Sequence, residues 1–169
     1  MRIEGEKVYL LPITKKDTAN VVKWRNRVRE HFIYQELFTA ESHNEWLEKM
    51  VFTGKVKQFV IYGKEDSMPV GSIFLRDIDT AHGKAEYGLF IGEDVARGKG
   101  YGTDAARLIC EYGFKELHLH KIFMRVFADN EASIRSNEKA GFVREGYLKE
   151  DVKINWQYRD VILMAKWAI

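Results

Sequence analysis

The sequence predicts a mixed α/β protein in which one mixed sheet carries helices on both of its faces. Segments rich in β-branched and aromatic residues alternate along the chain with segments whose apolar residues recur at helical spacing. No repeat or low-complexity tract interrupts this alternation. Only two prolines occur in the 169 residues, and no Ser/Gly-rich linker marks a boundary. A single domain over residues 1–169 is therefore expected.

Seven segments have the composition of β-strands, and the last two are expected to form a closing hairpin. They are residues 8–13, 58–62, 70–75, 85–91, 121–127, 142–148 and 157–167. Four further segments have a helical pattern. They are residues 15–29, a short helix through Trp46, Leu47 and Met50, residues 101–117, and the stretch from Asn130 to Ala140.

Local signals mark the ends of two of these helices. Ser42 and Glu45 form a candidate capping box before the short helix. Asn130 can cap the last helix, and Gly141 suits the position just after its C-terminus. The resulting order, β-α-α-β-β-β-α-β-α-β-β, differs from that of a regular doubly wound fold.

Charge and cysteine content bound the function class. The 27 basic and 25 acidic residues give a net charge of +2, and the basic residues are spread along the chain, so a nucleic-acid partner is not expected. The single cysteine, Cys110, lies in an apolar run and is expected to be a buried core thiol. The start of the chain lacks a signal-peptide core, and no stretch reaches about 18 apolar residues, so a cytoplasmic protein without a membrane span is expected.

The most informative stretch is VARGKGYGT, residues 95–103, which runs directly into a predicted helix. A helix start usually has a capping side chain. Three glycines at this place indicate instead that a ligand comes very close to the backbone amides.

Two glycine-loop chemistries do not fit this stretch. A GxxxxGK[ST] phosphate loop fails because Gly100 follows Lys99 where a hydroxyl residue would be needed. A GxGxxG dinucleotide motif fails because Thr103 takes the third glycine position. The pattern Arg97-x-x-Gly100-x-Gly102 between a strand and a long helix does fit a third type of loop.

With this pattern the sequence resembles the GNAT superfamily of acetyl-CoA-dependent N-acetyltransferases, over nearly the whole chain. VARGKGYGTDAARLICEYGF is similar to the acyl-CoA pyrophosphate loop of that family and to the helix behind it. NEASIRSNEKAGF, residues 130–142, resembles the next family signature in its RimJ/RimL-like form. The opening VYLLPITKKD and WRN at 24–26 are similar to that branch as well.

The resemblance implies the GNAT fold, with a central, mostly antiparallel twisted sheet of about six to seven strands. It implies acetyl-CoA as acetyl donor and cosubstrate, with no metal. A pyrophosphate needs several donors in a small space, and amides at a helix N-terminus supply them. The expected cofactor-binding residues in the loop are Arg97, Gly98, Lys99, Gly100, Tyr101, Gly102 and Thr103. The side chains of Arg97 and Lys99 either add charge or are merely solvated.

By the same resemblance, the backbone of Leu89, Phe90 and Ile91 is expected to hold the pantetheine arm and the developing oxyanion. Gly88 and Gly92 flank this stretch and would permit a bulge or splay.

The transfer needs a neutral amine and a proton for the departing thiolate. Glu86 resembles the general base of many relatives; the alternative is a cross-strand ion pair with a residue such as Arg76 or Arg125. Many relatives have a tyrosine that acts as general acid at the position of Asn137. Asparagine cannot take that role, so the candidate proton donors are Ser133, Tyr147 or a water.

Two asparagines are also expected at the cofactor. The segment from Ser133 to Asn137 is expected near the thiol of CoA. Asn130 is expected to cap its helix and to hold the pantetheine arm.

The acceptor side is less determined. Arg25, Asn26, His31 and Tyr34 are candidate substrate-binding residues, although Arg25 and Asn26 could simply cap a surface helix. The expected acceptor is a primary amine of a small molecule, such as a nucleotide-linked amino sugar, or of a protein N-terminus. A spermidine-type polyamine acceptor and a non-catalytic acyl-CoA-binding domain are the alternatives. A homodimer is plausible, and the pair His118 and His120 lacks the further ligands that zinc needs.

Overall fold

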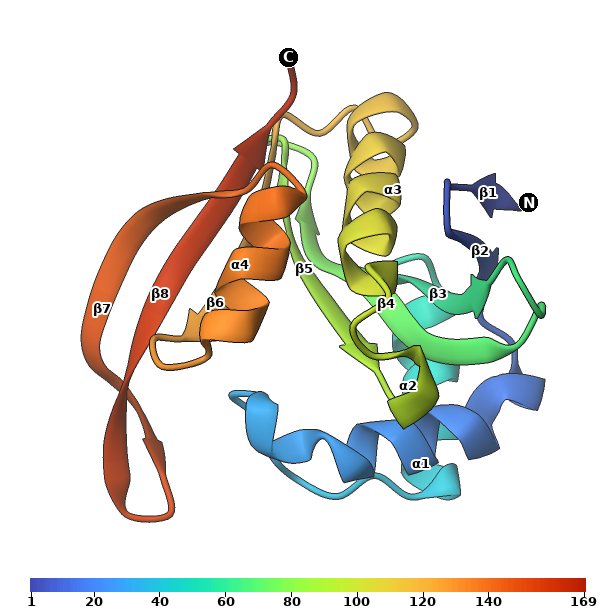
Figure 1. Ribbon diagram of the computed structural model, residues 1–169, viewed down its shortest axis with the longest axis horizontal. Coiled ribbons are helices and arrows are strands. Elements are labelled where there is room, and N and C mark those ends of the chain that lie inside the picture. Colours follow the sequence, from blue (N-terminus) through green and yellow to red (C-terminus); the bar gives the residue numbers. More distant parts are fainter.

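The computed structural model describes residues 1–169 and contains one sheet of eight strands in the order β1-β2-β3-β4-β5-β6-β8-β7 (Figure 1). Of its seven strand pairs only β5–β6 is parallel. The strands are β1 Ile3–Glu4, β2 Val8–Pro12, β3 Lys57–Gly63, β4 Pro69–Asp79, β5 Lys84–Ile91, β6 Lys121–Phe127, β7 Val143–Ile154 and β8 Gln157–Trp167.

Four α-helices flank this sheet (Figure 1). They are α1 Thr18–Arg27, α2 Ala40–Trp46, α3 Tyr101–Lys115 and α4 Glu131–Lys139. Short 3₁₀ turns at Lys15–Asp17, Arg29–His31 and Asp94–Ala96 and a π-helical turn at Leu47–Val51 complete the elements. The predicted mixed fold is confirmed, with the short edge strand β1 in addition to the seven predicted strands.

Two predicted helix starts differ from the structure. The segment 15–29 is not one helix, because Thr14 and Asp17 cap a 3₁₀ turn that precedes α1. The predicted capping box of Ser42 and Glu45 is wrong by three residues. The observed capping box consists of Thr39, the N-cap of α2, and Ser42, whose hydroxyl accepts a hydrogen bond from the backbone N–H of Thr39.

The helices bury the two faces of the sheet separately. Along β3, Phe59 and Ile61 face a core that includes Ile109 of α3, whereas Val60 between them faces a second core with Trp24 of α1. This is the period-two alternation of a strand buried on both sides. Cys110 lies in the first core, fully buried, and burial raises the pKa of its thiol to about 12.

The central strands separate halfway along their length. β5 pairs with β6 only from Lys84 to Glu86. Beyond Glu86, β5 stays with β4 as far as Ile91, while β6 stays with β8 as far as Phe127. Figure 1 shows β5 and β8 diverging toward the lower part of the view. A sheet that opens in this way leaves one edge of β5 free for a ligand.

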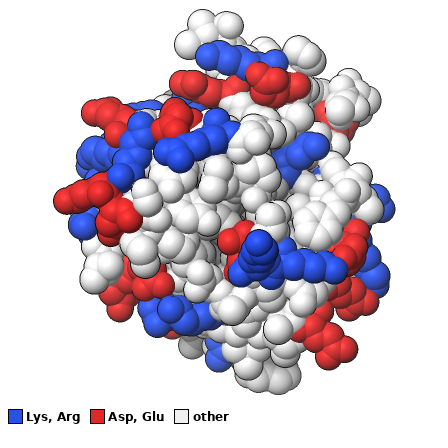
Figure 2. Space-filling model, turned by 90° about the vertical axis from the view of Figure 1, so that its right-hand side faces the viewer, with Lys and Arg blue, Asp and Glu red and all other residues white.

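No helix has the length and hydropathy to cross a bilayer. On the face seen in Figure 2, basic and acidic side chains are interspersed, and neither sign forms a continuous patch.

Candidate active site

A cavity of about 1020 Å³ opens where β5 and β6 separate. The residues around it come from the free half of β5, the loop before α3, the first turns of α4, β6, and the segment between α1 and α2. The sequence predictions for the cofactor and for the acceptor therefore fall largely on one continuous cavity.

The loop before α3 presents unpaired amides to this cavity. Gly98 and Gly100 have φ of 74° and 80°, the left-handed region that side chains rarely adopt. This conformation leaves the N–H groups of residues 98–103 without any acceptor in the chain. The amide of Arg97, also predicted to bind, instead donates to the carbonyl of Asp94 at 3.1 Å.

Gly102 has a different reason to be glycine. Its φ is ordinary, and an added Cβ would lie 3.4 Å from Cδ2 of Leu89 and 3.9 Å from Oγ of Ser136, which is normal contact. Both neighbours line the cavity. Space inside the chain would accept a methyl group here, so the close approach of a ligand remains as the reason for glycine.

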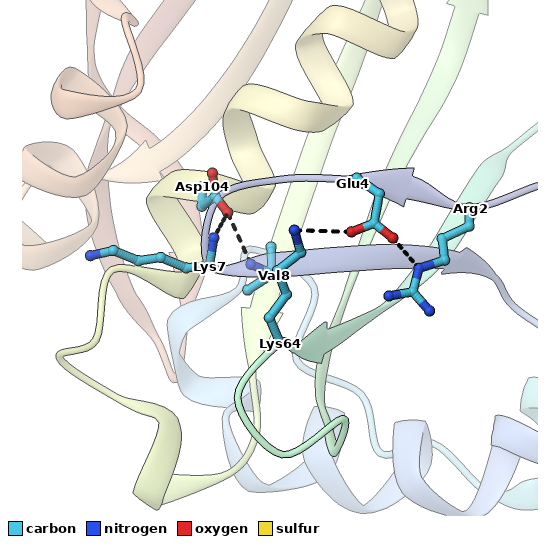
Figure 3. A network of polar contacts seen from close by, with 6 residues as sticks. All are labelled: Arg2, Glu4, Lys7, Val8, Lys64 and Asp104. Carbon is cyan, nitrogen blue, oxygen red and sulfur yellow. Dashed lines mark hydrogen bonds and ion pairs between the residues drawn. The ribbon is translucent and has the colours of Figure 1, made fainter.

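Three side chains, those of Asp104, Lys7 and Thr103, hold the start of α3 in place. Figure 3 shows Oδ2 of Asp104 between the backbone amides of Lys7 and Val8, at 2.7 and 3.0 Å. The Nζ of Lys7 donates to the carbonyl of Lys99 at 3.2 Å, so the side of the loop that carries Lys99 faces away from the cavity. On the other side the hydroxyl of Thr103 contacts that of Ser136 on α4 at 2.9 Å.

Leu89, Phe90 and Ile91 all line the cavity, as expected. Of the predicted bulge or splay, the bulge is absent at the flanking glycines, whereas β5 does splay from β6 beyond Glu86. Gly88 pairs regularly with Phe74, whose ring would lie 2.4 Å from an added Cβ, and at Gly92 the indole of Trp24 would lie 2.1 Å away. Both glycines are needed for close packing of an aromatic ring.

Glu86 lies at the point where β5 and β6 separate, with 3% of its surface exposed. Its Oε1 accepts from Nε of Arg76 at 2.8 Å and its Oε2 from Nε of Arg125 at 2.7 Å. Burial raises the pKa of this carboxyl, but the hydrogen bond and charge of Arg125 and the charge of Arg76 outweigh it and lower the pKa below its usual value. The ion pair given as the alternative role is therefore present, and a catalytic role stays a prediction.

The first turns of α4 close the cavity on the side of the glycine loop. Asn130 is the N-cap of this helix, since its Oδ1 accepts the amide of Ser133 at 3.3 Å, and both residues line the cavity. Asn137 is buried, donates to the carbonyl of Ser133 at 2.8 Å, and accepts the hydroxyl proton of Tyr87. Burial strongly raises the pKa of Tyr87, so its phenol stays protonated.

Tyr147, one of the candidate proton donors, lies elsewhere. It is on the outer strand β7, 60% exposed, and absent from the cavity lining. Its hydroxyl is hydrogen-bonded to Asp160 of β8, which raises its pKa. A hydroxyl that is bonded to Asp160 on the edge hairpin, outside the cavity lining, is not placed to protonate a thiolate in the cavity.

The α1–α2 segment, residues 28–39, covers the other side of the cavity, where the sequence predicts the acceptor. Asn26 does not line the cavity, because its amide group is used on both sides by the backbone of Phe38, at 2.7 and 2.8 Å. Its role is to hold this segment. Tyr34 and His31 do line the cavity.

Arg25 lines the cavity from the end of α1, with 6% of its surface exposed. Its guanidinium lies 4.0 Å from the ring of Phe32 and 5.0 Å from that of Phe38, and Nη2 donates to the carbonyl of Tyr34 at 2.5 Å. Burial lowers its pKa to about 10, so it is charged at neutral pH. Its Nη1 is buried without a partner, an arrangement that costs about 1–3 kcal/mol.

Several residues of the site carry no signal in a single sequence. Tyr87 and Phe38 read as core aromatics, and Ser136 as a polar position on a surface helix. The buried imidazole of His43, whose Nε2 also has no partner, lines the same cavity. His118 and His120 are both exposed, and no group of three or more His, Cys, Asp or Glu side chains has metal-binding geometry.

A left-handed glycine loop with six free amides, set beside a strand with a free edge, offers the clustered N–H donors that a phosphorylated ligand needs. Comparisons with known proteins agree. Residues 7–143 match the family model described as "Acetyltransferase (GNAT) domain". The chain therefore belongs to the GNAT acetyltransferase family and is an acetyl-CoA-dependent N-acetyltransferase.

The chain is similar to several relatives along its length. Spermidine N(1)-acetyltransferase of Escherichia coli strain K12 is 31% identical over 94% of this chain and 84% of its own length. Putative ribosomal N-acetyltransferase YdaF of Bacillus subtilis is 28% identical over 70% of this chain and 62% of its own. The crystal structure of spermidine N-acetyltransferase from Vibrio cholerae in complex with CoA and spermine superposes with a TM-score of 0.86, at 25% identity over 95% of each chain.

Proposed function

We propose that the enzyme transfers an acetyl group directly from acetyl-CoA to a primary amine of a small-molecule acceptor that enters below the α1–α2 segment. The observation that carries this proposal is the run of free amides at residues 98–103 beside the free edge of β5. In this arrangement the pyrophosphate and the acyl arm of one donor molecule lie on two adjacent elements.

In the proposed reaction, the amine nitrogen bonds to the thioester carbonyl carbon and the C–S bond then breaks. The amides of residues 98–103 hold the pyrophosphate, with the field of α3 behind them. The backbone of Leu89, Phe90 and Ile91 holds the pantetheine arm and donates to the carbonyl oxygen as it gains charge. Asn130 and Ser133 line the path of the arm on the opposite wall.

We infer that no side chain of the cavity with a pKa near neutral carries the two protons that the transfer moves. The attacking amine loses one proton, and the departing thiolate accepts one. The pKa of Glu86 is lowered and both its oxygens accept from guanidinium groups, so we infer that it chiefly holds Arg76 and Arg125 in place. Water in the cavity then carries the amine proton, and Ser133 or water delivers a proton to the thiolate.

The finer placement within the family is also a proposal. The segment from Asn130 to Phe142 favours the RimJ/RimL-like branch, and the YdaF relative supports that placement. Within it we favour a small-molecule acceptor, such as a nucleotide-linked amino sugar, over a protein N-terminus. A polyamine acceptor is the second candidate, because the names of two relatives include spermidine. A homodimer remains a prediction that light scattering would check.

The experiment is thiol release from acetyl-CoA with a panel of amines. The panel contains spermidine, peptides with free N-termini, aminoglycosides and UDP-linked 4-amino sugars. We expect a rate well above background for one class, with the acetylated amine identified by mass spectrometry. If acetyl-CoA binds but no amine reacts, the non-catalytic acyl-CoA-binding alternative gains support; if acetyl-CoA does not bind, the proposed cofactor loop is wrong.

A further inference from the structure

The acceptor side of the cavity contains three guanidinium groups. Arg76 and Arg125 flank Glu86 on the sheet, and Arg25 lies at the end of α1. Glu36 and Glu86 are the only carboxylates that line the whole cavity. Glu36 is exposed, so the buried part of this chamber has an excess of positive charge.

The two sheet arginines keep donors for a ligand. Arg76 uses Nε and Nη2 on Glu86, and Arg125 also uses Nε and Nη2 on it. In neither residue does Nη1 donate to Glu86, and their side chains are 29% and 26% exposed; the hydroxyl of Tyr34, which also lines the cavity, lies near Arg125 and favours its charge. Glu86 therefore fixes the orientation of two forks whose Nη1 groups it does not use.

Arg25 adds a second, independent observation. It is more than nine-tenths buried, and its Nη1 has no acceptor in the chain. Burial lowers the pKa of Arg25 most, the charge of Glu36 raises it, and the charge of Arg76 lowers it, so both groups lie near Arg25. Glu36 is exposed and forms no ion pair with Arg25, so the buried Nη1 beside a second cation is left for an anion from outside the chain.

We propose that the acceptor amine carries an anionic group, a phosphate or a carboxylate, and that Nη1 of Arg76 and Nη1 of Arg125 bind this group next to Arg25. The inference rests on the proposed function, since it names the acceptor class of the same site. Guanidinium forks suit both anions because their paired N–H groups match two oxygens. Arg76 and Arg125 are then specificity-determining residues, and Glu86 is the residue that positions them.

This assignment separates the chain from a polyamine enzyme. A polyamine brings two or more positive charges and no anion, and it would meet three guanidinium groups with one buried carboxylate already in use. On this proposal the acceptor in the names of the spermidine N-acetyltransferases does not carry over to this chain.

Anion binding by CoA-saturated protein tests the inference without any turnover. Saturating CoA fills the amides of the glycine loop, so an added anion cannot be scored there. Calorimetric titrations would then use inorganic phosphate, succinate and spermidine as probes, in a buffer free of other small anions. We expect phosphate or succinate to bind the wild type, and the tighter of the two identifies the anion.

Substitutions locate the binding. We expect Arg76→Gln and Arg125→Gln each to weaken anion binding at least tenfold, and the surface control Arg144→Gln to leave it unchanged. If a Gln variant loses its near-ultraviolet circular dichroism, Arg76→Lys or Arg125→Lys replaces it, because lysine keeps the charge but loses the fork; a weakening of at least threefold is then expected.

The outcomes are distinguishable from failure of the proposed function. Loss of CoA binding by the wild type would refute the cofactor site and is measured first on the same sample. With CoA bound, tighter binding of spermidine than of either anion would overturn the inference. So would the absence of anion binding, or anion binding that the arginine substitutions do not change.

Discussion

Gly102→Ala isolates the approach of the cofactor from the folding of the loop. At Gly100 any side chain is strained by a φ of 80°, so Gly100→Val would weaken CoA binding for two reasons at once. At Gly102 the φ is ordinary and the new methyl group would make only normal contacts, 3.4 Å to Leu89 and 3.9 Å to Ser136. The substitution therefore adds volume only toward the cavity.

The expected effects have opposite signs for folding and for binding. Alanine is favoured over glycine in a helix by up to about 1 kcal/mol, so the free energy of unfolding should stay equal or rise. The methyl group holds the pyrophosphate away from the amides, and losing one hydrogen bond to a charged group costs about 1.5–3 kcal/mol. Affinity for acetyl-CoA should fall by about 10- to 150-fold.

Calorimetric titration of acetyl-CoA and urea unfolding check both effects. Gly146→Ala is the matched control, since an added Cβ there lies 3.6 Å from Leu163 on the outer hairpin, away from the cavity. It should leave the acetyl-CoA affinity unchanged. Wild-type affinity in Gly102→Ala, together with wild-type stability, would refute the reasoning about the loop.

Three further substitutions test other parts of the site. Glu86→Gln should lower the free energy of unfolding by about 3 kcal/mol at pH 7. This difference from the wild type should shrink in acid, once the pH falls below 4.5 and the wild-type carboxyl becomes protonated. The substitution should also reduce turnover but not acetyl-CoA affinity, and unchanged turnover at every pH would exclude Glu86 from the mechanism. Asp104→Asn removes a charged acceptor of two amides, so the free energy of unfolding should fall by about 1.5–3 kcal/mol. The KM for acetyl-CoA should rise, and an unchanged KM would show that the contacts of Asp104 do not position the loop. Tyr147→Phe should leave kcat unchanged, and a tenfold loss would contradict its position outside the cavity.

The sequence located the glycine loop and the N-cap of α4 because both depend on the local backbone. Glycines that lie at a helix start and need positive φ are visible in the letters, as at Gly98 and Gly100. An N-cap such as Asn130 is equally local. Motifs of this kind report on the few residues around them, so one chain is enough to find them.

The acceptor half could not be predicted because it depends on contacts between distant elements. The two arginines of the Glu86 cluster lie on β4 and β6, 10 and 39 residues away in sequence. Whether Asn26 faces a substrate or holds Phe38 depends on the path of the α1–α2 segment. Tyr147 was a poor candidate for a similar reason, since only the strand order shows that β7 is the outer strand of the sheet and that Tyr147 lies outside the cavity lining.

The most direct test of the account follows the backbone amides of residues 98–103 by heteronuclear NMR while acetyl-CoA is added. The glycine signals make these amides readily identified, and amides that bind a pyrophosphate change their chemical shift and exchange more slowly with solvent. The account predicts large shifts and new protection at Gly98, Gly100 and Gly102, with little change at Gly146. Saturable acetyl-CoA binding that leaves the three loop glycines unchanged would contradict it.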